Sequence, residues 1–130
     1  MAWYIDTSAL VKLVTVEAET AALHEWVADH HPELVASDLL RTELQRAVRR
    51  SGTSQPIDIE EGLAAIDLLP ATPAVFDAAA ELEPADLRTL GSVHLATALG
   101  IADDCEGLIT YDSRLAAAAR HHGLTVISPS

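Results

Sequence analysis

Cysteine and basic residues are both scarce in this sequence, which has one cysteine and eight lysine or arginine residues among 130. Cys105 cannot form a disulfide within the chain, and this fits a protein of the reducing cytoplasm. The formal net charge of −12 argues against a protein that holds nucleic acid mainly through a broad basic face. An enzyme whose acidic site recruits divalent cations remains compatible with that charge.

Long hydrophobic runs are also missing. No apolar stretch approaches the length needed to span a membrane, and the N-terminus lacks the basic region of a signal peptide. The sequence has no internal repeat, no low-complexity segment and no linker long enough to divide it. Because 49% of the residues are hydrophobic, we expect a single globular domain, residues 1–130, with a substantial core.

Short apolar strands alternate with helical segments along the chain. This alternation predicts a three-layer α/β/α fold with a central parallel sheet of four to five strands. A loop is expected at 52–56. The pattern places strands at 2–5, 34–36, 66–69, 107–110 and 124–127, and helices at 8–16, 17–30, from 37–38 to about 51, 58–65, 74–82, 92–102 and 113–121.

Asp6 stands where the first strand meets the first helix. Thr7 and Ser8 are both credible N-caps for that helix, and Asp6 could itself be no more than a cap. The carboxyl end of a strand is, however, the edge at which open α/β sheets build their sites. Asp6 is therefore a candidate site residue.

Two further acids are predicted to reach the same edge. Glu43 lies one turn inside the helix after the second strand, and Asp112 directly follows the fourth strand. Each has a simpler explanation, since Glu43 could pair with Arg46 or Arg50 and Asp112 could cap a helix. If the three strands are neighbours, the carboxylates meet, and such a cluster makes sense mainly around a cation. All-oxygen ligands suit Mg²⁺ or Mn²⁺, which can bind a phosphate oxygen and activate water.

Four stretches carry a resemblance to a known family. In the order of the chain they are Asp6-Thr7-Ser8-Ala9-Leu10-Val11-Lys12, Ser37-Asp38-Leu39-Leu40-Arg41-Thr42-Glu43-Leu44, Leu87-Arg88-Thr89-Leu90-Gly91-Ser92-Val93-His94-Leu95-Ala96-Thr97-Ala98 and Thr110-Tyr111-Asp112-Ser113-Arg114-Leu115. These stretches resemble the signature blocks of PIN-domain ribonucleases, and most closely those of the VapC toxins of bacterial toxin–antitoxin pairs. They span nearly the whole chain.

The resemblance implies a toxin that is a Mg²⁺- or Mn²⁺-dependent endoribonuclease acting on structured RNA such as tRNA or rRNA. It implies a cognate VapB antitoxin that blocks the site, and a homodimer that assembles further with that antitoxin. By position, Asp6, Glu43 and Asp112 are the metal-site acids, and Ser8 is the hydroxyl beside them. His94 is expected to be a packed or supporting residue rather than a catalytic base, because its helix is apolar.

Gly91 is the departure from the family pattern, which generally has an acid at this position. No nearby acid is an evident replacement, because Asp86 lies before the helix and Asp103 and Asp104 lie at its far end. The alternatives are a deliberate inactivating change, which we favour because a toxic nuclease is hard to produce, and a naturally degenerate member. Glycine is acceptable at a helix start, so the fold should survive while the metal site weakens.

Half of the basic residues lie on the helix that carries Glu43. Arg41, Arg46, Arg49 and Arg50 are there, and the last three are spaced to share one face. They could form an ordinary solvated face or bind the RNA backbone near the cut site, and the two roles are compatible. The alternative to a nuclease is a non-catalytic module that keeps the fold and acts through a protein partner.

Overall fold

The computed structural model describes residues 1–52 and 58–130. The strands are β1 (Ala2–Ile5), β2 (Glu33–Ser37), β3 (Ile66–Leu69), β4 (Cys105–Ile109) and β5 (Val126–Ile127). The helices are α1 (Thr7–Val14), α2 (Thr20–His30), α3 (Leu40–Ser51), α4 (Ile59–Ala64), α5 (Pro73–Glu81), α6 (Thr89–Gly100) and α7 (Ser113–His121), with a 3₁₀ turn at Ala102–Asp104. Apart from Gly52, the loop predicted at 52–56 lies outside the described residues.

The strands form one sheet in the order β3-β2-β1-β4-β5, and every pair is parallel. β1 is therefore the central strand, with β2 on one side and β4 on the other. This confirms the neighbour relation on which the meeting of Asp6, Glu43 and Asp112 depends, because all three follow these strands. A strand covered on both faces should be apolar throughout, and Tyr4 and Ile5 at the end of β1 are fully buried.

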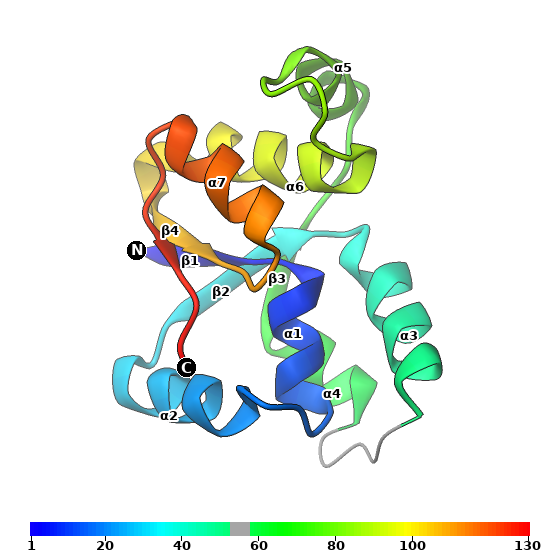
Figure 1. Ribbon diagram of the computed structural model, residues 1–130, viewed down its shortest axis with the longest axis vertical. Coiled ribbons are helices and arrows are strands. Elements are labelled where there is room, and N and C mark those ends of the chain that lie inside the picture. The colour runs from blue at the N-terminus through cyan, green and yellow to red at the C-terminus, as the bar shows by residue number, and fades with distance from the viewer. Residues whose placement is uncertain (53–57) are drawn as a thin grey trace.

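Helices cover both faces of the sheet, as predicted. Figure 1 shows α5, α6 and α7 on one face and α1, α2 and α4 on the other, with α3 beside α1 at one end. In the same view, the carboxyl ends of β1, β2 and β4 lie between α3 and α7. None of the described helices is long and apolar enough to cross a bilayer.

Some element boundaries differ from the prediction. α6 begins at Thr89 and not at 92, so Gly91 lies inside its first turn. α2 begins at Thr20 and not at 17, because Glu17 and Glu19 lie in the turn before it and pair with Lys12. β5 keeps only two of its four predicted residues. β3 and α7 have the predicted bounds.

Candidate functional site

Asp6 is the N-cap of α1. Its Oδ1 accepts a hydrogen bond from the backbone N–H of Ala9 at 3.1 Å, so the prediction that Thr7 or Ser8 caps this helix is wrong. The chain is still extended at Asp6, and an extended N-cap can turn its carboxylate back over the first turn. The helix start therefore fixes the direction of this carboxylate.

Capping does not account for the whole Asp6 side chain. Ser8 Oγ donates to its Oδ1 at 2.7 Å, and Thr110 Oγ1 donates to its Oδ2 at 2.7 Å. Only 4% of the residue is exposed. Burial raises the pKa of the Asp6 carboxyl, while the hydrogen bonds from Thr110 and Ser8 oppose that rise. A buried carboxylate held by three donors is more than a helix cap needs.

Ser8 and Thr110 also connect Asp6 to the end of β4. Ser8 Oγ accepts from the Tyr111 N–H at 2.9 Å, and Thr110 Oγ1 accepts from the Asp112 N–H at 3.0 Å. The two hydroxyls thus link the carboxyl ends of β1 and β4. Thr110 Oγ1 alone bridges the Asp6 carboxylate and the backbone N–H of Asp112. Ser8 therefore lies beside Asp6, one of the three predicted metal-site acids.

Glu43 projects from the first turn of α3 and pairs with a residue far away in the sequence. Its Oε1 lies 2.7 Å from Nε2 of His94 on α6, and the Glu43 side chain is 18% exposed. The predicted alternative, a solvated Glu43 paired with Arg46 or Arg50, is wrong. The other prediction, that His94 is a packed or supporting residue, agrees with its 3% exposure.

His94 is itself held by Tyr4. Tyr4 Oη lies 2.6 Å from Nδ1 of His94 and accepts a hydrogen bond from the Ser37 N–H at 2.9 Å. Burial raises the pKa of Tyr4 far above its usual range, so the phenol keeps its proton and donates it to Nδ1. In the neutral imidazole, Nδ1 then accepts this bond and Nε2 carries the proton toward Oε1 of Glu43, 2.7 Å away. A buried chain of hydrogen bonds therefore runs from the end of β2 through Tyr4 and His94 to the Glu43 carboxylate.

Asp112 is the N-cap of α7 and is exposed. Its Oδ1 accepts from the backbone N–H groups of Arg114 and Leu115 at 3.0 and 3.1 Å, which confirms the simpler explanation that Asp112 caps a helix. Capping uses one oxygen only. The residue therefore keeps a second oxygen for another partner.

The acids keep unused oxygens at this edge. Among the described residues, nothing donates to Oε2 of Glu43 or to Oδ2 of Asp112. Thr7 Oγ1 is the one buried side-chain oxygen or nitrogen without a partner in residues 1–52 and 58–130, and Thr7 lines a hollow with Ser8 and Glu43. Within those same ranges, no three Asp, Glu, His or Cys side chains lie close enough to hold a metal ion. The edge thus has carboxylate oxygens of the kind that bind a cation, but in the described residues these oxygens do not surround a single cation position.

Gly91 faces this opening. It lines a hollow of about 250 Å³ together with Asp112, and it occupies the third position of α6, after the N-cap Arg88. A Cβ built on Gly91 would lie 3.3 Å from Cδ1 of Leu87, the end of a flexible side chain. An acid at this position would therefore reach the side of Asp112 after a small shift of Leu87. Acidic residues are also favourable in the first turn of a helix.

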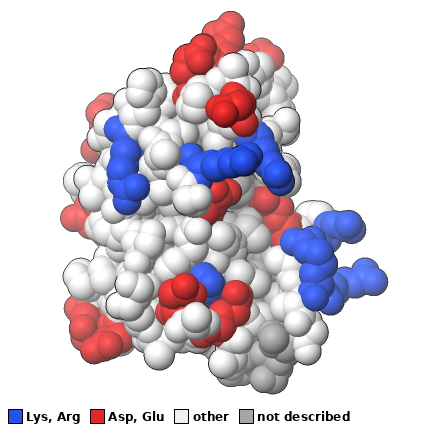
Figure 2. Space-filling view, viewed as in Figure 1, with Lys and Arg blue, Asp and Glu red and all other residues white. Residues whose placement is uncertain are grey.

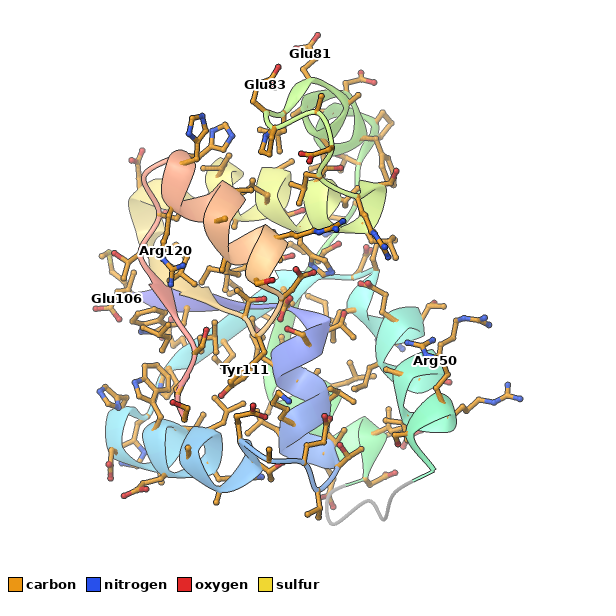
Figure 3. All side chains as sticks on the ribbon, in the orientation of Figure 1. Arg50, Glu81, Glu83, Glu106, Tyr111 and Arg120 are labelled. Carbon is orange, nitrogen blue, oxygen red and sulfur yellow. The ribbon has the colours of Figure 1, made fainter. Side chains whose placement is uncertain are left out.

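The arginines predicted to bind RNA lie on α3. Arg46 and Arg50 line the hollow that contains Ser8 and Glu43, and Arg46, Arg49 and Arg50 together line another. Figure 3 shows Arg50 on α3. Arg41 is exposed on the same helix but lines neither hollow. The predicted shared face of Arg46, Arg49 and Arg50 agrees with this arrangement.

The sequence reasoning missed two residues at this edge. Thr110 touches both Asp6 and the backbone of Asp112, and Tyr4 holds His94. A signal for Thr110 existed, since a hydroxyl residue two positions before an acid at a strand end can bond to the neighbouring backbone. The role of Tyr4 depends on contacts 33 and 90 residues away in the chain, which local spacing does not indicate.

Comparisons with known proteins show the family and the fold of this chain. Residues 3–128 match the family model of the PIN domain. Ribonuclease VapC46 of Mycobacterium tuberculosis is 43% identical over 127 residues, covering 98% of this chain and 97% of that protein. Ribonuclease VapC47 of the same species is 39% identical over 132 residues, covering 97% of this chain and 96% of that protein. The crystal structure of M. tuberculosis VapC20, described as a sarcin–ricin loop cleaving toxin, has the same fold, with a TM-score of 0.73 at 14% identity over 98% of this chain and 100% of that one.

Proposed function

Because this chain belongs to the PIN-domain family, and within it to the VapC ribonuclease toxins, we propose that its acidic edge is the site of a metal-dependent endoribonuclease. The observation that carries the proposal is that Asp6, Glu43 and Asp112 follow three neighbouring parallel strands, β1, β2 and β4, at the carboxyl edge of the sheet. Each acid is held by specific hydrogen bonds, and two of them keep an unused oxygen. We take residues 1–130 as a single PIN domain.

The donor set fits Mg²⁺ or Mn²⁺ in its chemistry. Asp6, Glu43 and Asp112 would hold the ion through carboxylate oxygens, and water would complete the shell, since Mg²⁺ readily keeps several waters. The hydroxyl of Thr7, which has no partner among the described residues, lies in the same hollow and could bind a water or a phosphate oxygen there. Such an ion supplies Lewis acidity toward a phosphate oxygen and lowers the pKa of a bound water. The protein's own part is to orient these oxygens through the hydrogen bonds that hold each acid.

Gly91 is proposed to leave this site incomplete. In residues 1–52 and 58–130, no three potential ligand side chains surround a single cation position. Gly91 and Asp112 line the same hollow, so an acid at position 91 would add a ligand on that side. Losing one charged group that acts on the transition state typically costs about a hundredfold or more in rate. We therefore expect the chain to cleave RNA weakly or not at all.

The proposed substrate is structured RNA such as tRNA or rRNA. The related VapC20 is described as cleaving the sarcin–ricin loop, which is a structured RNA target. On this chain, the cations of α3 lie beside Glu43, where they would bind the phosphate backbone next to the cut. Arg46, Arg49 and Arg50 are the residues that we assign to this contact, with Arg41 at the start of the same helix.

A VapB-type antitoxin is the proposed partner. An acidic opening between helices suits a segment that lays an apolar helix on the surface and directs a basic side chain toward the acids. We also propose a homodimer that assembles further with the antitoxin in the cytoplasm. The second candidate, a non-catalytic module acting through a protein partner, is favoured by one observation, which is Gly91 in the place of an acid.

The experiment that separates the candidates restores the missing acid. RNA cleavage is measured with Mg²⁺ or Mn²⁺ for the chain as it stands, for Gly91→Asp and for Gly91→Asn. The asparagine variant fills the same space without the charge, so it controls for packing against Leu87. We expect cleavage by Gly91→Asp alone, abolished by EDTA. If Gly91→Asp is as inactive as Gly91→Asn, the non-catalytic module is the better account.

A further inference from the structure

A second pair of arginines lies on the other side of the acids. Arg88 is the N-cap of α6, and Arg114 lies in the first turn of α7. Both line the hollow of about 250 Å³ that contains Gly91 and Asp112. They come from helices that follow different strands, so the fold and not the local sequence brings them together.

Neither arginine is neutralised by a neighbour. The chain has 20 acidic residues against eight basic ones, so a surface arginine placed at random would often meet a carboxylate. Among the described residues, the carboxylates within 4 Å of a basic group pair only with Lys12 and His94. The guanidinium groups of Arg88 and Arg114 therefore remain free to bind an anion, and their planar forks match two oxygens of a phosphate.

Figure 2 shows how these charges are arranged on the surface. One group of basic side chains lies over α3 and another lies between α6 and α7, and acidic side chains lie between them. The first group contains Arg46, Arg49 and Arg50, and the second contains Arg88 and Arg114. The acidic edge is thus flanked by cations on both sides, although the protein as a whole is strongly acidic.

We propose that Arg88 and Arg114 form a phosphate-binding subsite for RNA on the α7 side of the cut, opposite the arginines of α3. The inference rests on the proposed function, and it adds the path that the RNA backbone takes across the site. The RNA backbone crosses from α3 to α7, and the phosphate to be cut lies over the acids between them. Contacts of this kind position the backbone and carry no base specificity.

The subsite has a limit on its outer side. The next hollow, of about 610 Å³, shares Leu87 and Arg114 with the first but is also lined by Glu83 and Asp86. Carboxylates repel a phosphate backbone, so the basic track ends at Arg114. We therefore expect RNA to leave the surface there and not to follow α7 toward His121.

RNA binding in Mg²⁺ at a series of KCl concentrations tests the subsite. The Gly91 chain is used because it is expected to leave a labelled RNA hairpin intact, which a gel verifies. The variants are Arg88→Gln with Arg114→Gln, and separately Arg46→Gln with Arg50→Gln. Arg120→Gln is the matched control, because Arg120 lies on the same helix as Arg114 and lines none of these hollows. Figure 3 shows that Arg120 lies away from α3, near Glu106.

Each pair should weaken binding by about fivefold or more, and should reduce the slope of log Kd against log salt by about 0.7 per arginine. Arg120→Gln should change neither. If only the α3 pair weakens binding, the subsite is overturned while the proposed function stands. If neither pair differs from Arg120→Gln, RNA is not held at this edge, and the proposed function fails with the inference.

Discussion

The two sides of the acidic edge are built differently. On the β1 and β2 side, Asp6 and Glu43 are largely buried, and each is held by donors that are themselves fixed by the sheet. On the β4 and α6 side, Asp112 is exposed, and among the described residues its side chain bonds only to the start of its own helix, while Gly91 offers no side chain. The carboxylates on the first side cannot be moved without disturbing the core, whereas the second side can gain or lose an acid with little structural effect.

The difference indicates which half determines stability and which determines activity. A buried carboxylate is costly to the fold, and active sites commonly retain such costs for function. The side of Asp112 and Gly91 carries no buried carboxylate, and α6 runs through Gly91 without a break. We therefore predict that changes at Asp6 or Glu43 alter stability and metal affinity together. Changes at Gly91 should alter metal affinity and activity alone.

The largest expected effect comes from removing Asp6 after the missing acid is restored. In the Gly91→Asp background, Asp6→Ala should reduce RNA cleavage by about a hundredfold or more, because both carboxylates orient the same ion. In the present Gly91 background, Asp6→Ala should change the residual rate little, since groups that act as a unit are not additive. Single-turnover cleavage of the four chains measures this. If Asp6→Ala reduced the cleavage rate by the same factor in both backgrounds, Asp6 and the residue at position 91 would act independently.

The buried hydrogen-bond chain gives the next effect. Tyr4→Phe leaves the Ser37 N–H and Nδ1 of His94 without a partner, which should lower the free energy of unfolding by about 1–3 kcal/mol. In the Gly91→Asp background it should also weaken Mn²⁺ binding by about 10- to 100-fold, because Glu43 loses its support. Urea unfolding and Mn²⁺ titration measure the two quantities.

Tyr111→Phe is the matched control for this change. It removes a hydroxyl that donates to the Pro129 carbonyl at 2.6 Å on a half-buried side chain. We expect a loss of stability of about 1 kcal/mol or less and no change in Mn²⁺ affinity. A Tyr4→Phe variant that is less stable but binds Mn²⁺ normally would limit the Tyr4–His94 pair to a structural role.

The smallest effect is a gain of stability from Asp6→Asn. Burial raises the pKa of Asp6 above the ordinary value of 3.8, so its ionised form is less favourable in the folded chain than in the unfolded one. The stability associated with this group is fully present below the unfolded pKa and is lost as the pH rises through the folded pKa. In EDTA at neutral pH, Asp6→Asn should therefore be more stable by about 1 kcal/mol.

Thermal unfolding of both chains between acidic and neutral pH measures this difference. The advantage of Asp6→Asn should be small at about pH 4, near the unfolded pKa, and should grow as the pH rises. An asparagine variant that is less stable at neutral pH would mean that the donors around Asp6 outweigh its burial.

Much of the fold could be predicted because its signals are local. The alternation of apolar strands with helices predicted the parallel sheet, and Pro73 lies in the first turn of α5, a position that proline favours. The start of α6 was missed because Arg88, its N-cap, has no side-chain cap bond and is not a typical capping residue. Without that signal, the helix was predicted to begin after the glycine.

The candidate site was predictable in its residues but not in its contacts. Asp6 and Asp112 stand at strand ends, where the carboxyl edge of a parallel sheet brings such residues together. Helix spacing suggested Arg46 or Arg50 as the partner of Glu43 in the alternative without a metal site, but the observed partner is His94, 51 residues away. Packing of α6 against β2 decides that contact, and helix spacing carries no information about it.

A Mn²⁺ titration by electron paramagnetic resonance tests the central claim most directly, because it does not depend on finding the RNA substrate. The claim is that Asp6, Glu43 and Asp112 form a cation site that lacks one acid at Gly91. Gly91→Asp should bind Mn²⁺ at least about tenfold more tightly than the present chain or Gly91→Asn, and Asp112→Asn should reverse the gain. Equal Mn²⁺ affinities for Gly91→Asp and Gly91→Asn would contradict it.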